Sequence, residues 1–316
     1  MPNFNGVWSL TTQLQYRSDW PIFFPSQGRM LSAGGLDGST AINTIVSIDI
    51  NTGGANAVDF GDLTQARHSP SGCASTTRAC FQGGSTSGSF FPVNTIDYVT
   101  IANAGNATDF GNLTNTPHIG ASCNSATIGL YAGGYANNST YYNTIQKITI
   151  GSTGNASDFG DLSAAVRNLA ADSSSTRGLF FRGFDGSSSR NVIDYVTIAS
   201  DGNASDFGDS NYTGPAFGAC GSGVRSLIPQ ASNQVHVEYV TIASTGNATD
   251  FGDLPTSVPN QSSAASSATL AIFQHSGSNT LSQMTIATTG DGTDYGDLDS
   301  TVGYRDSTSS SNGGVQ

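Results

Sequence analysis

Short runs in which apolar residues recur at every second position are found along the chain, and the clearest reads NTIDYVTIA at residues 94–102. Such a period predicts a β-strand. Six copies align, and one strand face carries Ile48, Val99, Ile148, Val196, Val240 and Met284, followed two residues later by Ile50, Ile101, Ile150, Ile198, Ile242 and Ile286. The opposite face carries Ile45, Ile96, Ile145, Ile193, Val237 and Leu281. Apolar residues on both faces predict a strand that is covered on both sides.

Each run is followed by a polar turn such as STGNA and then by the motif DFG or DYG, with Phe or Tyr at 60, 110, 159, 207, 251 and 295. The motif recurs at steps of 50, 49, 48, 44 and 44 residues. Upstream of each run lie a Ser/Gly/Cys-rich segment (SPSGCAS, GASCNSA) and a hydrophobic segment that ends in glycines (TRACFQGG, TIGLYAGG). Four short strands per unit at this period are typical of a β-propeller blade.

The two ends of the chain predict how the ring closes. The segment SQGRMLSAGG from Ser26 begins as a second strand, whereas YRDSTSSSNGGVQ from Tyr304 resembles a first strand and stops where a second would begin. We therefore predict an all-β, six-bladed propeller over residues 26–316, in which the C-terminal strand joins the N-terminal blade. The alternative is seven blades, with residues 4–10 paired to the tail, but that blade would lack two strands.

Residues 1–25 lie outside the repeat and are rich in aromatic side chains. These are Phe4, Trp8, Tyr16, Trp20, Phe23 and Phe24. Two compatible interpretations stay open. The segment is either a cap over one propeller face or a docking arm that binds another protein, since exposed aromatic residues concentrate at interfaces.

Charge narrows the range of partners. The chain has 11 Lys plus Arg against 23 Asp plus Glu, a net charge of −12, and Lys147 is its single lysine. Binding to nucleic acid needs clustered cations, so we expect no nucleic-acid partner, and an anionic membrane surface is also disfavoured. The N-terminus lacks the features of a secretory signal and no apolar run reaches transmembrane length, so we expect no membrane insertion and synthesis in a cytoplasm.

Three of the four cysteines occupy one repeat position. In each of these repeats one residue follows DFGD or DFGN, namely Leu63, Leu113 or Ser210. Cys73, Cys123 and Cys220 each lie ten residues after that residue. Equivalent positions lie in different blades, so these residues are expected to be separate, buried thiols rather than disulfides or metal ligands.

The glycine pairs Gly34-Gly35, Gly83-Gly84 and Gly133-Gly134, together with the period near 50, resemble kelch or galactose-oxidase-type propeller repeats. The wording NTIDYVTIA and TGNATDFGDL is more specifically similar to kelch-like repeat proteins of tailed bacteriophages, especially marine and cyanobacterial phages. The segment VWSLTTQLQ resembles the leaders of such proteins. The resemblance implies a virion or tail-associated structural protein. The blades lack the kelch tryptophan, and the glycine pair is missing from SLIPQAS and AIFQHSG.

The DFG motif matches the magnesium-binding motif of protein kinases by its letters only. The other kinase motifs are not recognisable, and six copies favour a structural role in which Phe packs between blades, Gly permits a close approach and Asp accepts turn N–H groups. GNASDFGD gathers oxygen atoms that could bind calcium, but its spacing matches no known calcium loop, so we expect no metal and no cofactor. The histidines His68, His118, His236 and His275 are expected to line a rim or the channel rather than share a metal.

The loops between the second and third strands differ most among the copies, and divergent loops on a constant scaffold are typical of a binding surface. The candidate binding residues there are Phe90, Phe91, Tyr135, Tyr141, Tyr142, Phe184 and Arg190, which could stack on sugars or meet a protein. The leading hypothesis is a non-enzymatic virion component of a phage, in the tail or as a fibre or decoration protein. Its partners would be other virion proteins and a host-surface glycan or receptor. The alternative is a phage-borne propeller enzyme acting on host polysaccharide, which predicts a carboxylate cluster at the channel mouth.

Overall fold

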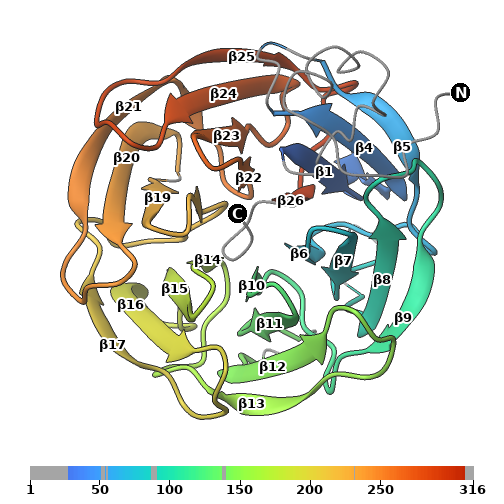
Figure 1. Ribbon diagram of the computed structural model, residues 1–316, viewed down its shortest axis with the longest axis horizontal. Coiled ribbons are helices and arrows are strands. Elements are labelled where there is room, and N and C mark those ends of the chain that lie inside the picture. The colour runs from blue at the N-terminus through green and yellow to red at the C-terminus, as the bar shows by residue number, and fades with distance from the viewer. Residues whose placement is uncertain are drawn as a thin grey trace, which may run out of the picture.

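Each repeat folds into a four-stranded antiparallel sheet, and six such sheets stand as blades around a common axis (Figure 1). The structure is a computed structural model that describes residues 28–50, 54, 56–86, 91–136, 140–230 and 232–309. The predicted six-bladed β-propeller is therefore confirmed. In the described part of the chain, no helix is long and apolar enough to cross a membrane.

The four strands of each blade follow one another from the axis outward. Blade 1 contains β26 (Asp306–Ser309), β1 (Arg29–Ala33), β4 (Thr44–Asp49) and β5 (Val58–Asp62). Blade 2 contains β6 (Ser71–Ala74), β7 (Arg78–Gln82), β8 (Thr95–Thr100) and β9 (Thr108–Asn112). Blade 3 contains β10 (Ala121–Asn124), β11 (Ile128–Ala132), β12 (Thr144–Thr149) and β13 (Ser157–Asp161).

The remaining blades repeat this order. Blade 4 contains β14 (Ala170–Ser173), β15 (Arg177–Phe184), β16 (Ser189–Thr197) and β17 (Ser205–Asp209). Blade 5 contains β18 (Cys220–Gly221), β19 (Arg225–Pro229), β20 (Gln234–Thr241) and β21 (Thr249–Val258). Blade 6 contains β22 (Ser263–Ser266), β23 (Leu270–Gln274), β24 (Thr280–Thr285) and β25 (Thr293–Asp297). A small hairpin, β2 (Leu36–Asp37) with β3 (Thr40–Ala41), extends from blade 1.

The C-terminal strand closes the ring. β1 pairs with β4 on one side and with β26 on the other, and Met30 lies opposite Ser309. Blade 1 is thus built from both ends of the repeat region, as predicted, and the count is six blades rather than seven. The aromatic segment with Phe4, Trp8, Tyr16, Trp20, Phe23 and Phe24 lies outside the described residues.

The core lies between the blades rather than within any one of them. Ile45 and Phe60 of blade 1 pack with Phe81 and Val99 of blade 2. On the other face of blade 1, Ile48 packs with residues of blade 6. The third strand of each blade therefore buries apolar side chains on both faces, which is the reason for its double apolar pattern.

The repeated DFG motif joins each blade to the next at the outer edge. At the first junction, the Gly105 amide donates to the Phe60 carbonyl over 2.7 Å, and the Ala107 amide donates to the Asp62 carbonyl over 2.7 Å. The Asp62 amide in turn donates to Oδ1 of Asn106. The predicted burial of Phe and close approach of Gly are found, but the hydrogen bonds of this junction use the main chain of Asp and the side chain of Asn.

The same junction is present around the ring, including the closing contact between blade 6 and blade 1. There, the Ala57 amide donates to the Asp297 carbonyl and the Asp297 amide to Asn56. The motif is thus the outer connection between blades. One side-chain oxygen of each turn, from Asn in five turns and from Asp291 in the turn after β24, therefore accepts a hydrogen bond from the neighbouring blade.

Candidate binding face

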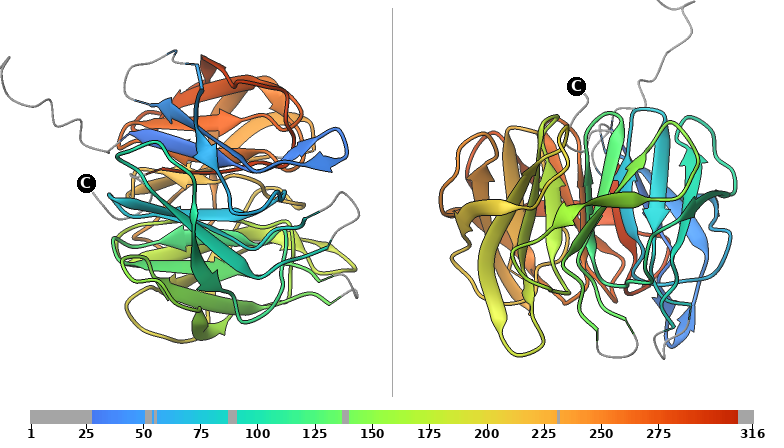
Figure 2. Two further views of the ribbon diagram at one scale, coloured as in Figure 1. Left: turned by 90° about the vertical axis from the view of Figure 1, so that its right-hand side faces the viewer. Right: turned by 90° about the horizontal axis from the view of Figure 1, so that it is seen from below.

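One face of the ring carries both the loops between second and third strands and the loops that enter each blade; we call it the loop face. In blade 3, Ala121 at the start of β10 lies opposite Ala132 at the end of β11, which places both ends at the same edge of the sheet. The longest loops extend from this side of the disc (Figure 2). The channel mouth and the predicted binding loops therefore share one surface.

An aromatic cluster forms on the loop face where blades 3 and 4 meet. The rings of Tyr135 and Tyr141 lie 5.2 Å apart at 66°, and the ring of Phe184 lies 6.3 Å from that of Tyr141. His118 packs edge-on against Tyr135. The Arg167 guanidinium lies 5.0, 5.6 and 5.5 Å from the ring centres of Tyr135, Tyr141 and Phe184, respectively. All three aromatic residues remain partly exposed.

The cluster uses positions that recur in the other blades. Three equivalent residues, His68, His118 and Arg167, each lie three residues before an inner strand. They form β-bridges with Ser85, Tyr135 and Phe184, respectively. Blade 2 thus has a serine where blades 3 and 4 have rings, and blade 4 has an arginine where blades 2 and 3 have histidines. Among the described residues, three rings around one arginine are found only at this junction.

The other predicted binding residues do not all join the cluster. Phe91 is on the blade 2 loop and is 58% exposed. Tyr142 is half-buried and its main chain links Gly134 to Val166, while Arg190 pairs with Asp185 at 3.2 Å. Phe90 lies outside the described residues. The structure therefore brings together Tyr135, Tyr141 and Phe184, and it adds Arg167 and His118, which the loop comparison did not single out.

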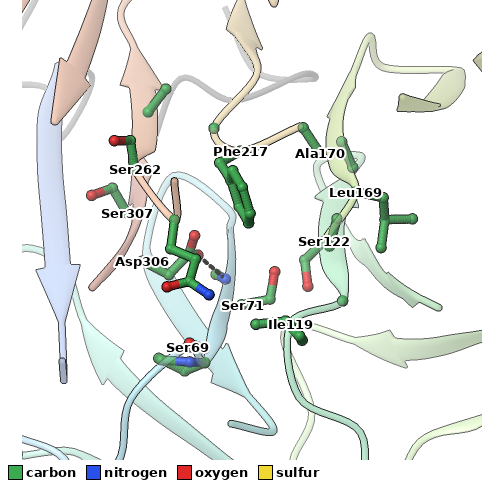
Figure 3. A pocket seen from close by; sticks show the side chains of 18 of the residues that line it. Ser69, Ser71, Ile119, Ser122, Leu169, Ala170, Phe217, Ser262, Asp306 and Ser307 are labelled. Carbon is green, nitrogen blue, oxygen red and sulfur yellow. Dashed lines mark hydrogen bonds between the residues drawn. The ribbon is translucent and has the colours of Figure 1, made fainter. Parts of the chain in front are cut away.

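A pocket of about 70 Å³ opens at the channel mouth, among the starts of the inner strands (Figure 3). Its lining includes hydroxyl groups of Ser69, Ser71, Ser122, Ser262 and Ser307, together with the Asp306 carboxylate. The ring of Phe217 is directed into the space that these residues surround. The pocket wall continues from the cluster, because Ile119 and Asn168, which follow His118 and Arg167 in the chain, both line it.

The rim of the pocket is built from residues with left-handed backbone angles. The five equivalent residues are Ser69, Ile119, Asn168, Gln261 and Tyr304, with φ of 49°, 53°, 55°, 62° and 61°. This conformation is uncommon for residues other than glycine, above all for a β-branched residue such as Ile119. Hydrogen bonds between blades hold it, from the Ser69 amide to the Tyr304 carbonyl and from the Asn168 amide to the Ile119 carbonyl.

Two inner strands carry carboxyl groups with raised pKa values; Asp172 is buried and Asp306 is half-buried. Burial raises the pKa of Asp306 to about 7, although the backbone amides of Gly72 and Ser307 donate to it and act in the opposite direction. Burial also raises the pKa of Asp172 to about 7, against the opposing effect of a hydrogen bond from the Ser173 amide. Asp306 lines the pocket, whereas Asp172 faces Gly221 of blade 5, where an added Cβ would meet its Oδ2 at 2.6 Å.

The cysteines and histidines take separate places. All four cysteines are free and buried, and Cys73, Cys123 and Cys220 lie on three different inner strands, as predicted. His68, His118 and His275 are buried, and burial lowers the pKa of His118 to about 4. His236 is instead half-exposed on blade 5, where Nδ1 lies 2.7 Å from Asp253 Oδ1 and its ring stacks on Tyr212.

Within the described residues, no group of three or more His, Cys, Asp or Glu side chains is arranged to hold a metal ion. Comparison with known proteins found no matching family model and no similar curated protein. The assignment of the loop face as a binding surface therefore depends on the geometry of this structure.

The pocket and the Arg167 position are what sequence comparison between repeats overlooked. Arg167 is signalled by its replacement of the histidine found at the equivalent positions 68 and 118. Asp306 is signalled by a carboxylate at the first position of an inner strand, where the other blades carry small residues such as Ser71 and Ala121. Phe217 lies three residues before Cys220, at a position that holds Pro70 and Gly120 in blades 2 and 3, so a large ring replaces a small residue there.

Proposed function

We propose that this chain is a non-enzymatic binding propeller of a phage particle, held to other virion proteins by its aromatic N-terminal segment and presenting the loop face to a host-surface partner. The observation that carries the binding role is the partly exposed cluster of Tyr135, Tyr141 and Phe184 around Arg167. The resemblance of the repeat to kelch-like proteins of tailed phages supports the virion role.

The distribution of polar groups favours binding over catalysis as the use of this scaffold. Several buried carboxylates of the third strands are engaged between blades: Asp97 accepts from Thr64 and pairs with Arg67 at 3.1 Å, and Asp194 accepts from Ser163. Glu238 likewise accepts from Ser210 and Asn211. These carboxylates stabilise the contacts between blades. The loops in which the repeats diverge instead present aromatic side chains and main-chain groups to solvent.

The particle role is tested by mass spectrometry of purified virions and by a truncation. All blade strands lie between Arg29 and Ser309, so a chain lacking residues 1–25 is expected to keep the melting temperature of the full chain. It is also expected to be lost from particles. Full retention of the truncated chain on particles would refute the docking arm, and absence of the full chain from purified virions would refute the virion role.

The host-partner role is tested separately with the loop face. Tyr141→Ala should reduce binding of the purified propeller to host cells, because it removes a ring that contacts both Tyr135 and Phe184. Val224→Ala is the matched control, since Val224 is 65% exposed in the turn between β18 and β19 on the opposite face. Equal binding by both variants would refute the assignment of this surface.

A second candidate function is a phage-borne enzyme acting on polysaccharide, and the observation that favours it is Asp306. A carboxyl group with a pKa near 7 at the mouth of a pocket can serve as a general acid. This function predicts hydrolysis or oxidation of host polysaccharide by the purified protein and its loss in Asp306→Asn. If the wild-type protein leaves the polysaccharide intact, the binding role stands alone.

A further inference from the structure

We propose that Arg167 and the aromatic cluster form a site for a carboxylate-bearing sugar, such as a uronic or nonulosonic acid, within a host-surface glycan. This inference rests on the proposed binding function and names the chemical class of its ligand. Four observations support it. They are the lack of a polar partner for the Arg167 side chain, its position in the repeat, the polar groups beside it, and the net charge of the chain.

Arg167 stands apart from the other cations of the described chain. Four arginines at the start of second strands donate to main-chain carbonyls of the next blade, and these are Arg29, Arg78, Arg177 and Arg225. Five further cations pair with carboxylates, and these are Arg67, Lys147, Arg182, Arg190 and Arg305. Arg167 alone among the described cations makes neither a hydrogen bond nor an ion pair through its side chain, and three aromatic rings lie within 6 Å of its guanidinium.

The placement of this arginine is a change specific to blade 4. The equivalent residues of blades 2 and 3 are His68 and His118, both buried. A neutral imidazole would fill the position between the inner loop and the ring of the neighbouring loop, as His118 does against Tyr135. Arginine instead brings a permanent positive charge to a partly exposed site, and ring faces compensate it only in part.

The guanidinium group selects a carboxylate. Its planar donors match both oxygens of a carboxylate, and a hydrogen bond between charged groups is about twice as strong as one between neutral groups. The nearby carboxylate of Asp185 is already occupied, because it accepts from the Ser187 and Ser188 amides and pairs with Arg190. A ligand carboxylate would therefore meet Arg167 without a competing acid from that loop.

The neighbouring groups match the rest of a sugar. Neither phenolic hydroxyl, of Tyr135 or of Tyr141, makes a hydrogen bond to a described residue, so both are available to sugar hydroxyls. Partly exposed rings can pack against the apolar face of a pyranose.

The surrounding charge favours such a ligand over an acidic peptide. The chain carries a net charge of −12, so a run of several carboxylates would be repelled by most of the surface. A glycan that presents one carboxylate among neutral hydroxyl groups needs only one cation, and the cluster supplies only one. An acidic peptide is therefore the competing outcome in the experiment rather than a second proposal.

The experiment measures binding of the full chain by isothermal titration calorimetry. The probes are N-acetylneuraminic acid, glucuronic acid and galacturonic acid, each compared with its methyl ester, and neutral galactose and tri-glutamate are further controls. We expect at least one acid sugar to bind, and we expect esterification of its carboxylate or Arg167→Gln to weaken binding by about 10- to 100-fold, the loss of a charged hydrogen-bonded pair.

Matched variants separate the site from the fold. Arg167→His inserts the residue that blades 2 and 3 already carry at this position, so it should keep the melting temperature while losing the acid sugar. Lys147→Gln is the control, because it removes a cation of β12 that pairs with Asp201 and is not part of the cluster; its affinity should stay within about twofold of wild type.

Four outcomes would overturn the inference. They are no binding by any of the three acids, equal binding of the methyl esters, unchanged affinity in Arg167→Gln, and binding of tri-glutamate as tight as that of the acid sugars. The host-cell binding assay tests the proposed function separately from the acid-sugar site. If Arg167→Gln binds host cells as wild type does while Tyr141→Ala does not, the loop face is a binding surface whose ligand is not an acid sugar.

Discussion

Replacement of Gly61 by alanine should weaken the junction between blades 1 and 2 more than any exposed substitution in the same turn. Gly61 is the glycine of the first DFG motif, with φ of 149°, and its α-carbon faces the turn of the next blade. A Cβ built there would lie 2.5 Å from the Gly105 carbonyl carbon and 2.9 Å from the Asn106 amide nitrogen. Main-chain atoms cannot move aside as a flexible side chain would, so the blades must separate locally.

The cost can be estimated from the contacts that separation would break. Hydrogen bonds from Gly105 to Phe60, from Ala107 to Asp62 and from Asp62 to Asn106 cross this junction. Each contributes about 1 kcal/mol, and an alanine held at this φ adds strain on the order of 1–3 kcal/mol. Loss of part of this set lowers the free energy of unfolding by about 3 kcal/mol, which for a chain of this size is a fall in melting temperature of roughly 4–5 °C.

The control is Gly105→Ala in the same junction, because a Cβ at Gly105 would have no atom within 4 Å. Both proteins are measured by thermal unfolding monitored by circular dichroism. Gly105→Ala should change the midpoint by no more than about 2 °C, as for an ordinary surface substitution. If the two variants melt together, the close approach of main chains is not what fixes glycine in the DFG motif.

Three further outcomes are expected. Asp172 and Asp306 have raised pKa values in the fold, so between about pH 4 and 7 they hold protons that the unfolded chain has released. The free energy of unfolding should therefore fall as the pH rises through that window. Urea unfolding of Asp172→Asn should show a smaller fall than that of the wild-type protein. The four buried thiols should be unreactive towards a thiol reagent in the native protein and all react in denaturant, whereas early reaction of any one would contradict its burial. Arg78→Gln breaks a 2.9 Å hydrogen bond to the Ile150 carbonyl and a contact 4.2 Å from the centre of the Tyr98 ring, so it should lower the free energy of unfolding by about 1–3 kcal/mol. Arg190→Gln, the control, should lower it by less than about 1 kcal/mol. Equal urea midpoints for the two variants would refute the interblade role of Arg78.

Much of the architecture follows from residues that lie close together in the sequence. The positions of Ile45 and Ile48, repeated six times, place apolar groups on both faces of a strand, and only a sheet covered on both sides satisfies that pattern. The unmatched ends of the repeat likewise determine closure, because β1 lacks an inner partner in its own segment and β26 lacks a second strand. Local pattern and the need to pair strand edges were sufficient for six blades and their order.

The tertiary structure alone decided which loop residues meet. Tyr135 and Phe184 belong to different blades, and their approach to Arg167 depends on the angle and spacing between two sheets, which no local pattern encodes. The candidate loops of the sequence contained Tyr135, Tyr141 and Phe184, but equally Phe91 and Tyr142, which lie outside the cluster. Asp306 shows the same limit: it begins a strand of polar residues, and burial in the closed ring raises its pKa. The amide of Gly72 in β6 of blade 2, more than two hundred residues away along the chain, donates to its carboxylate and opposes that shift. Within a blade, the repeat determines structure through neighbouring strands; between blades, the sites are made by residues that only the closed ring brings into contact.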